Sequence, residues 1–177
     1  MRRPRPSRCD RRLRRFAADF AARIGHLPLL PALFGEVQIA TEVHHEVAVA
    51  GAGRPAAQAV QTTHWLRVQP CPHPALLDQW CTGHPSLGRG ELATILLAHS
   101  IAANWTIIDE RAARRLAATQ GLKVIGCIGI LEAAFRRGLV SDLRDVYLAL
   151  LAQGIRVHPK ILNRSLVSFG LSPLDQR

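Results

Sequence analysis

The fold is decided by the stretch LGRGELATILLAHSIAANWTIIDERAARRLAATQGLKVIGCIGILEAAFRRGLV, which runs from Leu87 to Val140. Its apolar residues follow helical spacing in some segments and form short continuous runs in others. The run Trp105–Ile108 ends at an acidic residue, Asp109, and the run Leu122–Gly126 follows one helix later. Helices that alternate with short apolar strands indicate a mostly parallel sheet covered by helices. We therefore predict an α/β fold.

Working outward from this stretch, the same periodicity predicts further elements on both sides. Predicted helices cover Leu13–Leu27, Leu29–Phe34, Thr41–Ala50, Ala56–Gln61, Gly90–Ala102, Glu110–Gln120, Gly129–Arg137, Ser141–Gln153 and Pro159–Phe169. Predicted strands cover Glu36–Ala40, Trp65–Val68, Trp105–Ile108 and Leu122–Gly126. Residues 69–89 are rich in Pro, Gly, Cys and His, so we predict a long surface loop there with one helical turn at Ala75–Trp80. Gly121, Gly138 and Gly154 follow predicted helices and are expected to end them.

Acidic residues are scarce, at 13 of 177, and some stand where strands end or helices begin. Asp109 closes a buried strand, and the carboxyl edge of such strands is where open α/β sheets place their functional groups. Glu91 opens a predicted helix, and Glu46 lies on another. Gathered carboxylates repel one another, and a hard cation such as Mg²⁺ or Mn²⁺ relieves that repulsion.

Each carboxylate also has an interpretation without catalysis. An acid in the first turn of a helix is favoured by the helix dipole, which would explain Glu91. Asp109 can serve as an N-cap with Glu110 in the first turn that follows. Glu46, beside two histidines on its helix, can simply be solvated.

Charge divides the chain into two parts. Residues 1–15 contain eight arginines and one aspartate, whereas the remaining residues carry an excess of only about three positive charges. We therefore predict a basic, disordered arm at 1–15 and one domain at 16–177. The mild basicity of that domain is compatible with RNA binding without requiring it.

Cysteine usage and hydropathy bear on the compartment. The four cysteines show no regular spacing, and Cys127, in an apolar run, is expected to be a small core residue. No secretory signal follows the basic start, and the longest uncharged stretch is shorter than the roughly 20 apolar residues of a membrane span. We expect a reduced, cytoplasmic protein.

The segments GRGELATILLA and WTIIDERAARRLAATQGLKVIGCIGILEAAFRRGLV resemble the PIN-like nucleases, in particular uncharacterised proteins related to VapC toxins. The resemblance begins at IGHLPLLPALFGEVQIATEVHHEV (Ile24 to Val47) and extends to about Leu171. It implies a PIN-like three-layer domain and an endoribonuclease that uses Mg²⁺ or Mn²⁺. It also implies RNA as substrate, an antitoxin protein as partner and a homodimer.

By position, the resemblance assigns metal-ligand roles to Glu46, Glu91, Asp109 and Glu110, the last three also being catalytic. Arg114 falls where the family often has an arginine beside the acidic pair. With Arg111 and Arg115 it is a candidate RNA contact, although a solvated helix face explains the three equally well.

One departure from the family pattern is serious. The family begins with an apolar strand that ends in a metal-binding Asp, and the expected Asp falls near Arg14, with no apolar run before it. Asp10 and Asp19 do not fit the motif. A central parallel strand is a continuous apolar run, so residues 1–15 cannot supply it. Either the domain is degenerate, or these residues come from a wrong start or reading frame.

Two further interpretations remain open. The first is a degenerate, inactive PIN-like module that binds RNA or a protein partner without cutting. The second is a binding protein in which a zinc ion, held by Cys71, His73, Cys81 and His84, staples the loop at 69–89.

Overall fold

The computed structural model describes residues 27–49, 63–155 and 157–174. The predicted arm, most of the helix predicted at Leu13–Leu27 and the helix predicted at Ala56–Gln61 lie outside these residues. The described helices are α2 (Leu29–Phe34), α3 (Thr41–His44), α5 (Pro74–Gly83), α6 (Arg89–Ser100), α7 (Arg111–Thr119), α8 (Cys127–Arg136), α9 (Leu143–Ala152) and α10 (Pro159–Ser168). The strands are β1 (Val37–Ala40), β2 (Leu66–Gln69), β3 (Thr106–Ile107) and β4 (Val124–Ile125).

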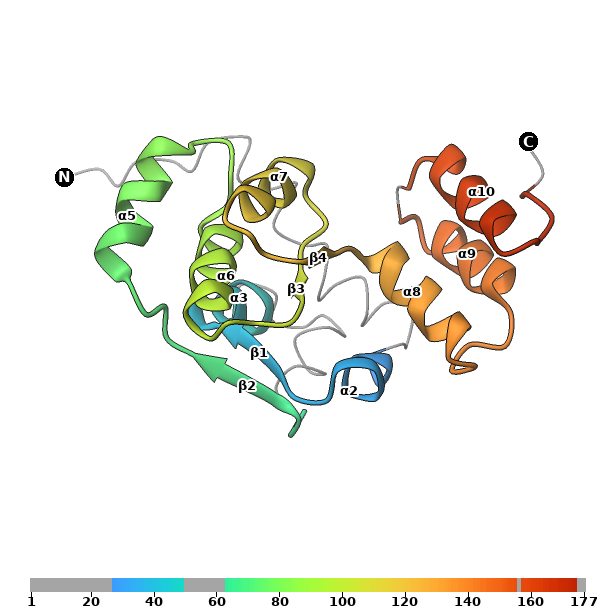
Figure 1. Ribbon diagram of the computed structural model, residues 1–177, viewed down its shortest axis with the longest axis horizontal. Coiled ribbons are helices and arrows are strands. Elements are labelled where there is room, and N and C mark those ends of the chain that lie inside the picture. Colours follow the sequence, from blue (N-terminus) through green and yellow to red (C-terminus); the bar gives the residue numbers. More distant parts are fainter. Residues whose placement is uncertain (1–26, 50–62, 156, 175–177) are drawn as a thin grey trace.

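All described strand pairs are parallel, as the alternation of helices and strands predicted. Strand β1 pairs with β2 in the register Val37↔Leu66, and β3 pairs with β4 in the register Ile107↔Ile125. Helix α6 contacts β1 and β3, so it joins the two pairs, and α9 and α10 form the end of the molecule farthest from α5 (Figure 1). The α/β class is confirmed.

The described strands form two separate sheets. Strand β1 belongs to one two-stranded sheet and β3 to the other. A cavity of about 750 Å³ is lined by both of these strands and by residues of α2, α6 and α8. The predicted lack of the family's first strand falls on residues outside the described ones, so it stays a prediction.

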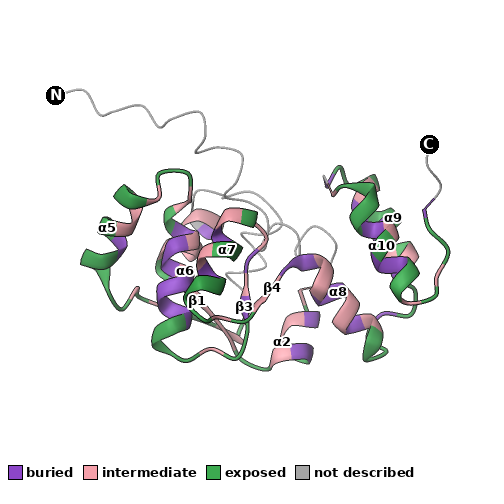
Figure 2. Cartoon of the chain, turned by 45° about the horizontal axis from the view of Figure 1, so that its top comes forward, coloured by how far each residue is buried: buried purple, intermediate pink, exposed green. Residues whose placement is uncertain are grey.

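Two groups of helices provide the core. Helix α6 is buried along most of its length, as Figure 2 shows, because Leu92, Ala93 and Ile95 are fully covered. The larger cluster joins α2, α8, α9 and α10. Within it Tyr147 bonds to Ser165 at 2.7 Å, and burial raises the pKa of Tyr147 to about 12, so the phenol stays neutral at physiological pH. No helix in the described residues is long and apolar enough to cross a membrane.

Three helices end where glycines were predicted to end them. Gly121, Gly138 and Gly154 adopt φ values of +75°, +70° and +72°, a conformation that glycine adopts at no steric cost. The predicted loop at 69–89 was wrong in part, because Pro74–Gly83 forms a helix of 10 residues. Proline at the first helical position is compatible with helix formation, and Leu77 buries its side chain against α6.

The helix predicted to begin at Ser141 begins instead at Leu143, and Asp142 caps it by accepting hydrogen bonds from the amides of Arg144 and Asp145. Helix α3 begins at Thr41 as predicted, and the hydroxyl of Thr41 donates to the carbonyl of Gln69 at 3.2 Å. The helix predicted at Thr41–Ala50 changes after His44 into a π-helical turn over His45–Val49.

A buried hydroxyl on β3 provides a test of this packing. Thr106 is 3% exposed, lines the cavity, and its Oγ1 has no hydrogen-bond partner among the described residues. An unsatisfied buried hydroxyl is destabilising, and valine has nearly the same shape. We expect Thr106→Val to raise the free energy of unfolding by about 1 kcal/mol, measured by urea denaturation.

The matched control is Thr94→Val on α6. The Thr94 hydroxyl donates to the carbonyl of Gly90 at 2.7 Å, so this change removes a hydrogen bond that is made and should not stabilise. A Thr106→Val variant less stable than the parent would show that water or another group satisfies the hydroxyl.

Candidate functional site

Asp109 lies at the carboxyl edge of the β3–β4 pair. The amide of Ile108 still bonds to the carbonyl of Ile125 at 3.0 Å, so Asp109 is the next residue after the paired strand. Cys127 follows the neighbouring strand, β4, and contacts Asp109 at this edge. The amide of Cys127 donates to Asp109 Oδ1 at 2.7 Å, and its thiol donates to Oδ2 at 2.6 Å. Both oxygens of this carboxylate are therefore held by one residue.

The predicted core position of Cys127 is confirmed, since only 3% of it is exposed. Burial raises the pKa of its thiol, and the charge of Asp109 and the hydrogen bond to it act in the same direction. The thiol therefore keeps its proton and serves as a hydrogen-bond donor.

Gly126, between β4 and Cys127, allows this close approach. A Cβ atom built there would lie 2.9 Å from Asp109 Oδ1 and 2.5 Å from Nη1 of Arg114. Carboxylate and guanidinium thus both lie close to the position that a side chain at residue 126 would occupy. The sequence interpretation missed both Gly126 and Cys127 as site residues, although both follow the strand beside Asp109.

Glu110 is the N-cap of α7, and its Oε2 accepts a hydrogen bond from the amide of Ala113 at 2.7 Å. The alternative that Asp109 caps this helix is therefore wrong. Because Glu110 caps the helix, Asp109 is left to face the start of α8.

Glu91 lies in the first turn of α6, as predicted. Its Oε2 accepts a hydrogen bond from the amide of Gly88 at 2.7 Å. Beside it, the carboxylate of Glu46 lies against Gly90, where a built Cβ atom would be 2.9 Å from Oε2. The structure thus brings Glu46 to the residue that precedes Glu91.

Glu46 thus lies at the start of α6, and Asp109 lies at the start of α8. In the described parts of the chain, no set of three or more His, Cys, Asp or Glu residues is arranged to hold a metal ion. The chemistry of the donors still fits Mg²⁺ or Mn²⁺, because both prefer carboxylate oxygens. Glu42, one turn before Glu46, adds a buried Oε2 without a hydrogen-bond partner among the described residues.

The three arginines predicted to contact RNA lie on α7 and are exposed. Arg114 is directed towards Gly126 and hence towards the edge that carries Asp109. Arg111 and Arg115 have side chains open to solvent. An exposed cationic side chain can pair with a phosphate at little desolvation cost.

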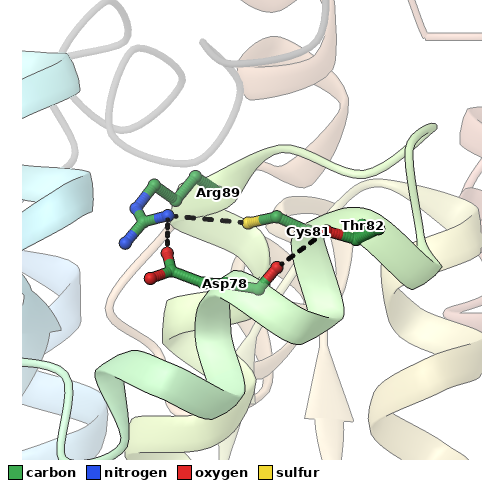
Figure 3. A network of polar contacts seen from close by, with 4 residues as sticks. All are labelled: Asp78, Cys81, Thr82 and Arg89. Atoms are coloured by element: carbon green, nitrogen blue, oxygen red, sulfur yellow. Dashed lines mark hydrogen bonds and ion pairs between the residues drawn. The ribbon is translucent and has the colours of Figure 1, made fainter.

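The zinc interpretation gains no support from the structure. Cys71, His73, Cys81 and His84 are all described and form no metal-binding group with one another. Cys81 instead contacts Arg89, with its Sγ 3.8 Å from Nη1, and the guanidinium of Arg89 pairs with Asp78 at 2.7 Å. Figure 3 draws these contacts as dashed lines.

A family model described as a PIN domain matches residues 19–170, which is most of the 177-residue chain. No match was found among curated proteins or among solved structures.

Proposed function

Because the chain belongs to the PIN domain family, we propose that it is a metal-dependent endoribonuclease. The substrate is RNA, and the hydrolysed bond is an internal phosphodiester. The domain that carries this activity spans residues 16–177, and residues 1–15 are an arm outside it.

The placement of Asp109 carries the proposal. It follows a parallel strand at the edge where α/β sheets place functional groups, and both of its oxygens are held by Cys127. A carboxylate held in one orientation is suited to a metal ion or to a water molecule.

The proposed ligands of Mg²⁺ or Mn²⁺ are Glu46, Glu91, Asp109 and Glu110. A bound divalent ion supplies Lewis-acid chemistry, which activates water and stabilises charge on the phosphate. The carboxylate of Glu110 takes the proton of the attacking water. As water adds to phosphorus, the P–O bond to the leaving oxygen breaks, and that oxygen leaves with a proton from solvent.

The arginines of α7 hold the substrate. Arg114, beside Asp109, neutralises the phosphate that is attacked, and Arg111 and Arg115 bind phosphates that flank it. Such contacts neutralise charge without reading sequence, so they position RNA and do not select it.

We also propose a biological setting. The chain acts as the toxin of a toxin–antitoxin pair in the cytoplasm, a small antitoxin protein covers the site, and the toxin is a homodimer. This setting rests on the sequence resemblance to relatives of VapC toxins.

The test is cleavage of a mixed RNA pool by the purified chain with Mn²⁺ and with excess chelator. We expect cleavage that the chelator abolishes and that Glu91→Gln slows about tenfold or more. Glutamine can still accept the hydrogen bond from the amide of Gly88, so this contact is kept while the charge is lost. Glu36→Gln is the matched control, since Glu36 is exposed and its carboxylate contacts the side chains of Arg67 and Gln38.

A second candidate is a PIN-like module that binds RNA without cutting it. The observation that favours it is that the described residues include no group of three or more His, Cys, Asp or Glu side chains arranged to hold a metal ion. If the folded parent binds RNA in a filter assay but cuts none of it with Mn²⁺, the result supports this binding module and contradicts the nuclease.

A further inference from the structure

Cys127 does more than fill space in the core. It is the first residue of α8, it is buried, and it donates two hydrogen bonds to one carboxylate. One bond comes from the main chain and goes to Oδ1, and the other comes from the side chain and goes to Oδ2. Two bonds from two different atoms fix the rotation of a carboxylate, which a single bond leaves open.

The carboxylates of Glu91, Glu110 and Asp109 differ in where their hydrogen-bond donors lie in the chain. Glu110 and Glu91 each accept an amide hydrogen bond at the start of their own helix. Asp109, in contrast, is held by a residue 18 positions later, across the parallel pair of β3 and β4. The orientation of Asp109 therefore depends on the pairing of the two strands and on the start of α8.

The main-chain bond is supplied by the fold. The first amides of a helix have no partner within the helix, and the helix dipole favours a negative charge there. Any residue at position 127 other than proline would supply that amide. The thiol is the part of the contact that depends on the side chain at this position.

We propose that Cys127 is a positioning residue whose thiol sets the orientation of the Asp109 carboxylate towards the metal ion. This role rests on the proposed function, because it requires Asp109 to be a ligand. Groups that orient metal ligands typically change metal affinity or activity by about 10- to 100-fold when they are removed.

The test compares Cys127→Ala, which removes the donor, with Cys127→Ser, which replaces it by a hydroxyl. Mn²⁺ binding is measured directly by electron paramagnetic resonance, and RNA cleavage is measured alongside. We expect Cys127→Ala to weaken Mn²⁺ binding about tenfold and to lower kcat at fixed Mn²⁺, with little change in the KM for RNA. Cys127→Ser should restore most of both values.

Cys71→Ala is the matched control, because it removes a partly buried thiol that follows β2. A Cys127→Ala variant that binds Mn²⁺ as tightly as the parent would overturn the role of the thiol. Equal losses in the alanine and serine variants, in proportion to a lower Tm, would also overturn it and leave a packing role.

The two proposals can fail separately. If the parent binds Mn²⁺ in a way that depends on Cys127 but cuts no RNA, the positioning role is supported and the nuclease proposal is wrong. If the parent cuts RNA and Cys127→Ala behaves as the parent, only the positioning role falls. A parent that binds no Mn²⁺ would overturn both.

Discussion

The Asp109→Asn variant should cut RNA on the order of 10³-fold more slowly than the parent at saturating Mn²⁺. Asparagine has the same shape but no charge, so it is a poor ligand for a hard cation. Its amide nitrogen is also a donor and would face the amide or the thiol of Cys127, which are donors themselves. A 10³-fold loss equals about 4 kcal/mol of transition-state stabilisation, within the range expected when a catalytic metal is lost.

The matched control for this variant is Asp145→Asn, in the first turn of α9. Asp145 is exposed, and α9 lies near the end of the molecule opposite α5 (Figure 1). Both variants lose one negative charge, so a change in general RNA affinity would affect both. Cleavage by Asp109→Asn within about twofold of the parent would remove Asp109 from the proposed site.

Sequence patterns predicted the elements that carry the proposed site residues because the signals for those elements are local. An apolar run that ends at Asp109 predicts both the strand and its carboxyl edge. Glycines that follow helical periodicity predicted three helix ends, since few other residues adopt a positive φ. The position of Glu91 in a first helical turn follows from the same periodicity.

Contacts between elements were not predictable in this way. The two hydrogen bonds of Cys127 depend on the register of β3 with β4, which no single segment encodes. One signal was available: Asp109 and Gly126 end successive predicted strands, and the ends of adjacent parallel strands share an edge. The helix at Pro74–Gly83 was predicted only in part, as a turn at Ala75–Trp80, because its proline and glycine were taken as loop residues although they stand at its ends.

Gly126→Ala should lower RNA cleavage about 10²-fold, a loss comparable to removing a group that orients a metal ligand. The backbone of Gly126 has φ −101° and ψ 175°, which any residue can adopt, so backbone strain plays no part. The obstacle is the added methyl group, 2.9 Å from Asp109 Oδ1 and 2.5 Å from Arg114 Nη1. Arg114 can swing away, but Asp109 cannot move without breaking its bonds to Cys127.

A double variant identifies which neighbour the methyl group displaces. If Asp109 is displaced, adding Arg114→Ala to Gly126→Ala leaves the loss of stability, about 1–3 kcal/mol for overpacking, unchanged, whereas that loss disappears if Arg114 is the displaced neighbour. Gly83→Ala is the matched control, because a Cβ atom there meets no atom within 4 Å. Full activity in Gly126→Ala would mean that the edge can open without loss of function, and that the exact position of Asp109 does not limit cleavage.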